Sequence, residues 1–240
     1  MRQHESINLK TKPMSNIEPY IYPEGKWMQM RAGSFTSSQI GKLFTSPKTK
    51  LAKDNGELSE TAKSYIFDKA AELLTGTIRN TYTTPEMQWG LDQEPYAIEM
   101  IKDIYPNIEY YGTENPKFFS YSDFSGGSPD AVCDNIVFEV KCPNPRTHIE
   151  YLLCEGDLQS MNKDYWYQIQ MNIACVAKDK GINPMDMTGM FVSYCPLMIE
   201  PKLRICKFEV EPNESFQELL PFTIKQAEAY LRTIIDKFEL

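Results

Sequence analysis

Three side chains that could do chemistry together lie within one short stretch, SPDAVCDNIVFEVKCP, which runs from Ser128 to Pro143. Asp130 follows a proline, and Glu139 and Lys141 come nine and eleven residues after it. Two carboxylates and an amine suit a divalent cation held by hard oxygen ligands, with the lysine beside it. The stretch therefore predicts a metal-assisted hydrolytic site.

The elements that must position these side chains are two strands and a turn. From residue 136 to residue 141, apolar and other residues alternate, which is typical of a strand. Successive strand side chains point to opposite faces, so Glu139 and Lys141 share a face. A turn at Asp134 and Asn135 would return the preceding strand alongside and place Asp130 near Glu139.

Length and composition favour one globular domain. The chain has 240 residues, 42% of them hydrophobic and 24% charged, which is ordinary for a soluble protein with a sizeable core. No apolar run approaches the length of a membrane span, and the N-terminal MRQHESINLKTKP has no apolar core of a secretory signal. We expect no membrane partner, a cytoplasmic location, and an irregular, polar, proline-containing arm over residues 1–25.

Charge and cysteine content restrict the kinds of site. A net charge of −8 argues against a broad basic surface for DNA, but it does not exclude a local one, because residues 41–53 carry four lysines and no acidic residue. The six cysteines form no CxxC pair and do not cluster, so we expect reduced thiols and neither a zinc nor an iron–sulfur centre.

Hydrophobic spacing predicts the remaining elements. The expected helices are at about 36–44, 53–74, 85–105, 147–153, 162–177 and 214–238, and the expected strands are at 117–121, 136–141, 188–195 and 203–210. A loop is expected at 79–85 and a hairpin turn at 125–127, and Gly76 is the expected stop of the second helix.

The sequence around the three candidate residues resembles a known nuclease signature. Pro129 and Asp130, followed by EVK at 139–141, resemble the PD-(D/E)xK motif, and the fuller SPDAV and FEVKCP resemble the lambda exonuclease or YqaJ-like recombination exonucleases of phages. The resemblance implies an α/β fold with a restriction-endonuclease-like core, in which helices flank a central mixed β-sheet. It implies a single nuclease domain over residues 26–240.

The resemblance also implies a set of active-site residues. Asp130, Glu139, the Val140 carbonyl and Glu94 would hold Mg²⁺, for which Mn²⁺ would substitute, and Lys141 would orient or activate water. Glu94 is carried over from the run QWG, three residues and a glutamate; its alternative is a surface glutamate favoured by the helix dipole. The YxxQxQ run places Gln168 in the active site, with a solvated glutamine as the alternative.

A pocket for the 5′-phosphate of a DNA end is implied by a second group of residues. Arg31 and Ser38 match the arginine and the Thr/Ser-rich helix start of the family, where hydroxyls and an arginine suit a phosphate. The alternative is a solvated arginine and a capping serine. Ser128 matches a family serine, with a turn serine equally compatible. Arg146 is one residue short of a phosphate-binding arginine of the family.

The resemblance to the phage recombination exonucleases implies an Mg²⁺-dependent 5′→3′ exonuclease acting on double-stranded DNA ends. The products would be mononucleotides and 3′ single-stranded tails, used in phage-type homologous recombination in a bacterial host. By family analogy the protein would form a trimeric ring and work with a single-strand annealing protein. The alternatives are another PD-(D/E)xK endonuclease and a non-catalytic DNA-binding or assembly protein of the same fold.

Overall fold

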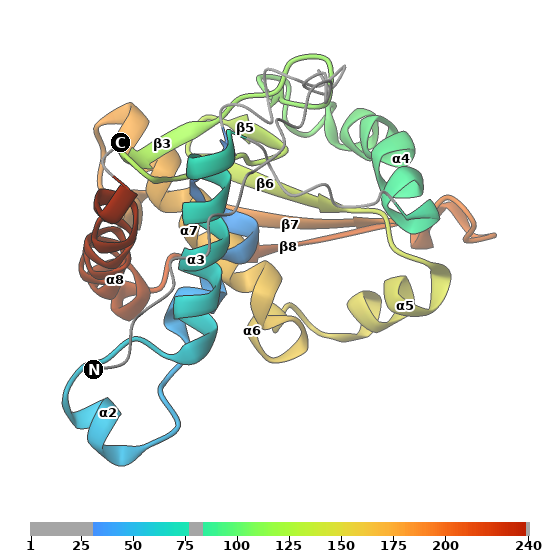
Figure 1. Cartoon of the computed structure of the whole chain (residues 1–240). Coiled ribbons are helices and arrows are strands. Elements are labelled where there is room, and N and C mark those ends of the chain that lie inside the picture. The colour runs from blue at the N-terminus through green and yellow to red at the C-terminus, as the bar shows by residue number, and fades with distance from the viewer. Residues whose placement is uncertain (1–30, 77–83, 239–240) are drawn as a thin grey trace, which may run out of the picture.

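A five-stranded mixed sheet forms the centre of the molecule and contains the stretch with the candidate chemistry (Figure 1). The computed structural model describes residues 31–76 and 84–238, so the predicted arm and most of the loop predicted at 79–85 lie outside the described residues. The strands are β2 (Glu109–Tyr110), β5 (Ala131–Cys133), β6 (Ile136–Lys141), β7 (Thr188–Tyr194) and β8 (Ile205–Val210), in the order β2-β5-β6-β7-β8. Only β6 and β7 pair in parallel, so the predicted mixed α/β fold is confirmed.

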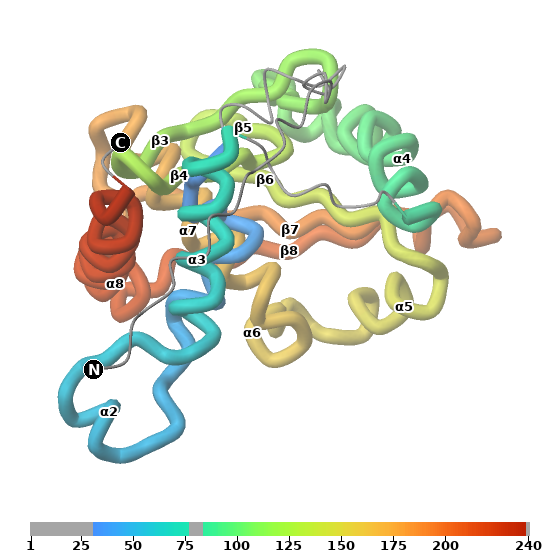
Figure 2. Tube along the Cα trace, in the orientation of Figure 1, coloured from blue at the N-terminus to red at the C-terminus, as the bar shows by residue number. Residues whose placement is uncertain are grey.

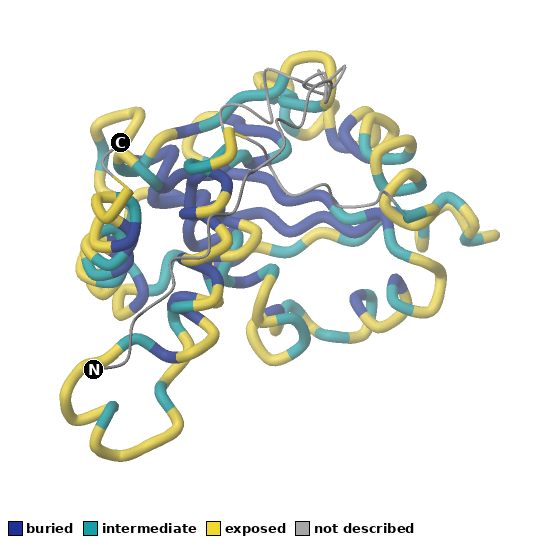
Figure 3. The backbone as a smooth tube through the Cα atoms, in the orientation of Figure 1, coloured by how far each residue is buried: buried dark blue, intermediate teal, exposed yellow. Residues whose placement is uncertain are grey.

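Each face of this sheet has its own hydrophobic core, covered by different helices. On one face, α4 (Pro85–Ile101) packs against Phe138 and Val140. On the other face, Val137 belongs to the larger core that includes α7 (Lys163–Lys180). The period-two alternation of β6 therefore divides its side chains between the two cores. Figure 3 shows β6 and β7 buried along most of their length.

A small second sheet has the order β1-β4-β3, and it corrects the predicted hairpin turn at 125–127. β4 (Ser125–Gly127) is a strand, paired parallel with β1 (Phe35–Thr36) and antiparallel with β3 (Phe119–Ser122). The glycines of β4 lie where a side chain would clash with its neighbours: an added Cβ at Gly126 would lie 2.4 Å from the Phe118 ring. The absence of side chains thus allows close strand packing here.

The predicted helix at 53–74 is two helices, α2 (Lys50–Asp54) and α3 (Glu60–Thr75). Gly56 adopts a positive φ of 66°, which no continuing helix contains. Ser59 then caps α3 by accepting a hydrogen bond from the Ala62 amide at 3.0 Å. The prediction overlooked these two start and stop signals.

The other helices agree with the predictions except at particular ends. α4 continues through Pro95, where the missing hydrogen bond falls at the exposed turn of Leu91. The helix predicted at Thr36 or Ser37 is the 3₁₀ helix η1 (Ser37–Phe44), and Gly76 ends α3 at φ 65° as predicted. The remaining elements are α5 (Pro145–Leu153), α6 (Leu158–Met161), η2 (Pro184–Asp186), η3 (Pro201–Leu203), α8 (Glu214–Ile235) and η4 (Asp236–Phe238).

α3 and α8 lie side by side at one end of the molecule, and α4 and α5 lie toward the other (Figure 2). All six cysteines are free, as predicted. Within the described ranges, no helix has the length and apolar character needed to span a bilayer.

Candidate active site

The hairpin of β5 and β6 brings Asp130 beside Glu139. Its turn contains Asp134 in the left-handed conformation, at φ 48°, as the predicted tight turn requires. The Asp130 amide donates to the Phe138 carbonyl at 3.1 Å, and the Asp130 Oδ2 accepts from the Val140 amide at 2.6 Å. Asp130 is therefore bonded to the backbone of β6 on either side of Glu139, through its amide at Phe138 and its carboxylate at Val140.

Glu139 and Lys141 share the face of β6 that turns toward α7, as the alternation predicts. Glu139 is fully buried, whereas the Lys141 side chain is 24% exposed. The Lys141 Nζ donates to Glu139 Oε1, and the Asn172 Nδ2 of α7 donates to Glu139 Oε2 at 3.2 Å. Both oxygens of the carboxylate thus have donors, one charged and one neutral.

Burial and mutual charge control the protonation of this group. Burial raises the pKa of Glu139; the Lys141 ammonium opposes that rise, and the charge on Asp130 adds to it. Burial also raises the pKa of Asp130, against Lys141 and the Val140 amide. Burial alone would lower the pKa of Lys141, but Glu139 and Asp130 outweigh it and raise the pKa. Lys141 therefore stays protonated, because its ammonium interacts favourably with the two carboxylates, which repel each other.

Glu94 comes from α4, on the opposite side of the sheet from α7. Burial raises the pKa of Glu94 to about 8, and the charge on Asp130 contributes to the rise, while a hydrogen bond from Tyr110 opposes it. The interaction with Asp130 locates Glu94 beside the hairpin. Across residues 31–76 and 84–238, however, no three His, Cys, Asp or Glu side chains form a ready-made ligand set. The structure pairs Asp130 with Glu139 and leaves Glu94 as an electrostatic neighbour.

Gln168 lies on α7, half-buried, one helical turn before Asn172. Residues four apart share a helix face, and Asn172 bonds Glu139, so Gln168 lies on the face of α7 that the hairpin adjoins. Gln170, on another face, is buried and structural: it binds the Glu211 carbonyl at 2.8 Å. Tyr165 also adjoins the site, with its ring centre 5.0 Å from the Lys141 Nζ.

The sequence analysis did not identify Asn172 as a site residue. Its side chain is buried, and its Oδ1 has no hydrogen-bond partner within the described part of the chain. A Cβ on Gly127 would come within 2.3 Å of that Oδ1, so the glycine makes room for the amide. The signal that could have found Asn172 is its position four residues after Gln168 on the same face.

Comparison with known proteins identifies the family of this chain. The sequence model of the YqaJ-like viral recombinase domain matches residues 26–189, about two thirds of the chain. The chain belongs to this family. A comparison with curated protein sequences gives no match.

The solved structures of similar fold include exonucleases. An alkaline exonuclease, LHK-Exo, from Laribacter hongkongensis has a TM-score of 0.67 and 21% identity, covering 89% of this chain and 95% of that one. The same enzyme in complex with dAMP gives 0.68 and 22%, with the same coverage. A phage-related exonuclease from Haemophilus somnus 129PT gives 0.67 and 16%, covering 85% of this chain and 96% of that one. At these identities the likeness establishes the fold.

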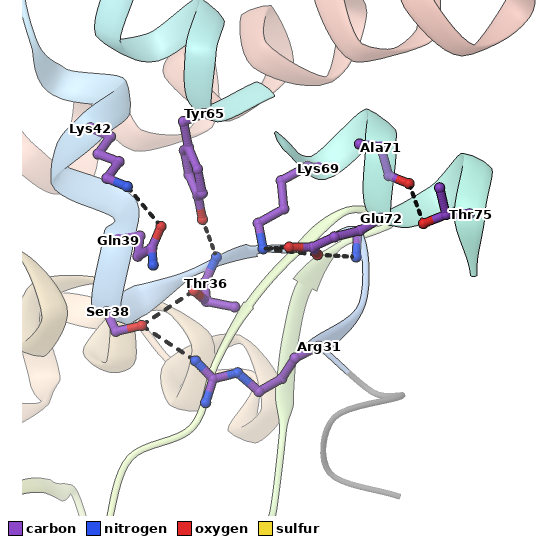
Figure 4. A network of polar contacts seen from close by, with 11 residues as sticks. Arg31, Thr36, Ser38, Gln39, Lys42, Tyr65, Lys69, Ala71, Glu72 and Thr75 are labelled. Carbon is purple, nitrogen blue, oxygen red and sulfur yellow. Dashed lines mark hydrogen bonds and ion pairs between the residues drawn. The ribbon is translucent and has the colours of Figure 1, made fainter. Parts of the chain in front are cut away.

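In this YqaJ-like domain, Arg31 and Ser38 lie together near the hairpin. The Arg31 Nη2 donates to Ser38 Oγ at 3.3 Å (Figure 4). Burial lowers the pKa of Arg31, while Tyr65, Glu139, Glu72 and Asp130 oppose this, in that order. The guanidinium is thus close enough to interact electrostatically with the carboxylates of Glu139 and Asp130. Ser38 is exposed and so accessible to a ligand.

Ser128 has the features of a ligand-binding hydroxyl. Its Oγ is buried and has no hydrogen-bond partner among the described residues. A buried hydroxyl without a partner is costly, and a bound oxygen would satisfy it. Ser128 follows Gly127, whose position beside Asn172 places both unsatisfied oxygens in one region.

Arg146 is placed differently from the other candidates for the phosphate pocket. It lies in the first turn of α5, with a side chain 90% exposed, and its Nε contacts Glu150 Oε1 at 3.3 Å. This contact joins two residues of the same helix. The structure therefore brings three of the four predicted phosphate residues toward the hairpin and leaves Arg146 on an exposed helix face.

The residues of the hairpin fit a divalent cation. Asp130 and Glu139 supply carboxylate oxygens and Val140 a carbonyl on the same strand. Burial raises the pKa of Asp130, of Glu139 and of Glu94 nearby, and the charge on Asp130 adds to the rise for Glu139 and Glu94, so these carboxylates repel one another in a buried place. A divalent cation would relieve that repulsion, and it prefers these oxygens.

Proposed function

We propose that this chain is an Mg²⁺-dependent exonuclease that digests double-stranded DNA from its 5′ ends, releasing mononucleotides and leaving 3′ single-stranded tails. The observation that carries the proposal is the meeting of Asp130, Glu139 and Lys141 on one hairpin, with Arg31 close enough to interact with both carboxylates.

The proposed roles follow from the chemistry of each side chain. Asp130, Glu139 and the Val140 carbonyl hold Mg²⁺, for which Mn²⁺ substitutes, and Glu94 supports them from α4. When bound, the metal lowers the pKa of coordinated water and offsets charge on the phosphate. Lys141 orients the attacking water and stabilises the charge that develops on the phosphoryl oxygens.

Gln168 orients water or a phosphate oxygen through its amide, which can both donate and accept.

The contact between Lys141 and Glu139 is compatible with these roles. An ammonium has three donors and a carboxylate about four lone-pair sites, so Lys141 would keep its contact with Glu139 Oε1 and donate to a scissile phosphate as well, while Glu139 would still have lone pairs to hold a cation.

Direction of digestion depends on the proposed phosphate pocket. Arg31, Ser38 and Ser128 offer a guanidinium and two hydroxyls to the 5′-phosphate of the DNA end. The exonucleases of similar fold support this proposal, and LHK-Exo has been solved with dAMP, a mononucleotide. Arg146 is not part of the pocket that we propose.

In its biological setting, the enzyme would act on DNA ends in the cytoplasm of a bacterial host during phage-type recombination. We propose a homotrimeric ring and a single-strand annealing protein as partner, both on the family's precedent.

The decisive experiment compares DNA topologies and ends. The protein is incubated with linear duplex carrying a 5′-phosphate, linear duplex carrying a 5′-hydroxyl, and closed circular plasmid, each in Mg²⁺, Mn²⁺ or EDTA. We expect digestion of the phosphorylated linear DNA with either metal and none in EDTA. Nicking of the plasmid would indicate an endonuclease, and DNA binding without digestion would indicate a non-catalytic protein; either result contradicts the proposal.

A further inference from the structure

A buried ion pair on α3 needs an explanation that stability alone does not give. Lys69 Nζ lies 2.9 Å from Glu72 Oε1 and 3.0 Å from Oε2, and the two side chains are only 10% and 9% exposed. The desolvation of two charges offsets most of their attraction, so a buried pair contributes little net stability. The question is what these charges hold in place.

They hold the main chain of the segment that carries Arg31. Glu72 Oε2 accepts a hydrogen bond from the Gly33 amide at 2.9 Å, in a buried position (Figure 4). Gly33 adopts a positive φ of 69°, and an added Cβ would lie 2.3 Å from Leu73 Cδ2. The main chain therefore packs closely against α3 at this point, where any other residue would be strained at this φ and would have to displace the Leu73 side chain.

A second hydrogen bond from α3 fixes the same segment three residues later. The Tyr65 hydroxyl accepts from the Thr36 amide at 3.0 Å, again in a buried position. Between these two attachments, the Phe35 ring packs on the Tyr65 ring at 5.6 Å between centroids. Side chains of one helix thus hold residues 33 to 36 by two amides and a ring.

The held segment positions the two groups assigned to the DNA end. The Arg31 carbonyl accepts from the Ser34 amide at 3.0 Å, so a turn ties Arg31 to the attached main chain. At the other end, Ser38 Oγ lies 3.3 Å from Thr36 Oγ1 and accepts from Arg31 Nη2. The separation of guanidinium and hydroxyl is therefore set by the main chain that α3 holds.

Lys69 has an electrostatic part in this arrangement. The Glu72 carboxylate lies near enough to attract the Arg31 guanidinium. The Lys69 ammonium neutralises the Glu72 carboxylate. Glu72 therefore attracts the Arg31 guanidinium less strongly, which leaves the guanidinium available to a phosphate.

We infer that Tyr65 and Glu72 are positioning residues for a 5′-phosphate, which act through the Thr36 and Gly33 amides on Arg31 and Ser38, and that Lys69 neutralises the charge of Glu72. This inference rests on the proposed function and deepens it, because it makes α3 the element that sets selectivity for phosphorylated ends.

Two double variants separate the hydrogen bond from the charges. Lys69→Met with Glu72→Gln removes both charges but keeps an oxygen acceptor for the Gly33 amide. Lys69→Met with Glu72→Leu removes the acceptor as well. Tyr65→Phe removes only the acceptor for the Thr36 amide and keeps the ring. The matched control is Glu60→Gln with Lys63→Met, an ion pair of the same i,i+3 spacing and the same 2.9 Å distance on the same helix, but exposed.

The measurement is the preference for a phosphorylated end. Anisotropy of labelled duplex with a 5′-phosphate or a 5′-hydroxyl gives a binding ratio in EDTA, without cleavage, and initial rates in Mg²⁺ give a digestion ratio. We expect the leucine-containing variant and Tyr65→Phe each to lower both ratios about tenfold, the size of one lost buried hydrogen bond. The glutamine-containing variant and the exposed-pair control should retain both ratios.

The outcomes distinguish the inference from the proposed function. If the wild-type protein shows no preference for a 5′-phosphate, the proposed pocket is wrong and the inference falls with it. If the wild type shows the preference and the leucine-containing variant keeps it, the pocket stands and only the role of α3 is wrong. An equal loss on both kinds of end would also overturn the inference, because a merely structural defect does not discriminate between ends.

Discussion

The catalytic hairpin and the segment at residues 31–38 are built in opposite ways. In the hairpin, Asp130, Glu139 and Lys141 lie within twelve residues, and strand pairing alone brings them together. The 31–38 segment has short regular structure of its own, and it is held by side chains about thirty to forty residues away on α3. The geometry of the hairpin is thus set by its own strand pairing, whereas the geometry of the 31–38 segment is set by contacts with α3.

This difference teaches where substitutions should act. Changes in the hairpin remove a reacting group and should affect every substrate. Changes around the 31–38 segment should affect only the recognition of the DNA end. The predictions below test that division, from the largest expected effect to the smallest.

Replacing Lys141 should have the largest effect. Lys141→Ala removes the amine beside Glu139 and Asp130, and loss of such a group from an electrostatic site costs about a hundredfold to a thousandfold in rate. We therefore expect digestion of linear duplex to be abolished in a standard assay on both 5′-phosphate and 5′-hydroxyl ends. Circular dichroism should show an intact fold. Digestion at the wild-type rate would discard the mechanism.

Replacing Arg31 should act on one kind of end. Arg31→Ala removes a charged donor, and such hydrogen bonds contribute about 1.5–3 kcal/mol. We expect the preference for a 5′-phosphate to fall by about tenfold to a hundredfold, with the rate on 5′-hydroxyl ends little changed. The matched control is Arg146→Ala, since Arg146 is exposed and already contacts Glu150. If Arg146→Ala lowered the preference as much as Arg31→Ala, the pocket would have to include α5.

The same contrast explains what the sequence could predict. Alternation in β6, the turn at Asp134 and the three reactive side chains are all local signals, and they predicted the hairpin correctly. The large strands and the core stripes of α4, α7 and α8 were predictable for the same reason, because their periodicity is continuous. The mixed sheet followed from the family resemblance.

Long-range contacts account for what the sequence did not give. The strand at Ser125–Gly127 was predicted to be a turn because of its two glycines. These glycines are there because side chains would clash with Phe118 and Asn172, and hydrophobic periodicity carries no signal for such contacts. The attachment of Gly33 to Glu72 and the bond from Asn172 to Glu139 depend on tertiary packing. No residue spacing indicates the attachment of Gly33 to Glu72, and the position of Asn172 four residues after Gln168 indicates only a shared helix face, not the bond to Glu139.

Asn172 tests whether the hairpin is truly self-sufficient. Asn172→Leu removes the neutral donor to Glu139 Oε2 while keeping a similar volume, and one such bond corresponds to about tenfold. We expect the Mg²⁺ concentration for half-maximal rate to rise by about that factor, equally on both kinds of end, because Glu139 is less well oriented. Asn172→Gln is the less severe comparison variant. An effect on end preference without a change in Mg²⁺ dependence would contradict this role.

His148 should give the smallest effect, and it reaches the hairpin through its neighbour β7. The ring is fully buried, with Nε2 2.8 Å from the Leu203 carbonyl and Nδ1 2.7 Å from Ser193 Oγ. A carbonyl only accepts, so Nε2 carries the proton and Nδ1 accepts from the serine, which fixes a neutral tautomer. Ser193 pairs in register with Lys141, so this contact supports the strand beside the catalytic lysine.

Burial lowers the pKa of His148 from 6.5, although the bond to the Leu203 carbonyl opposes this. Below pH 6.5 the unfolded chain therefore takes up a proton that the folded chain does not, and the free energy of unfolding falls by up to ~1.4 kcal/mol per pH unit until the lowered pKa is reached. His148→Gln keeps a donor for Leu203 and cannot titrate. In urea unfolding at pH 7.5, 6.5 and 5.5, the wild type should lose stability between the last two values by more than the variant does. Parallel losses would show that other groups carry the acid sensitivity, and that the link from α5 to the strand beside Lys141 does not depend on the neutral imidazole.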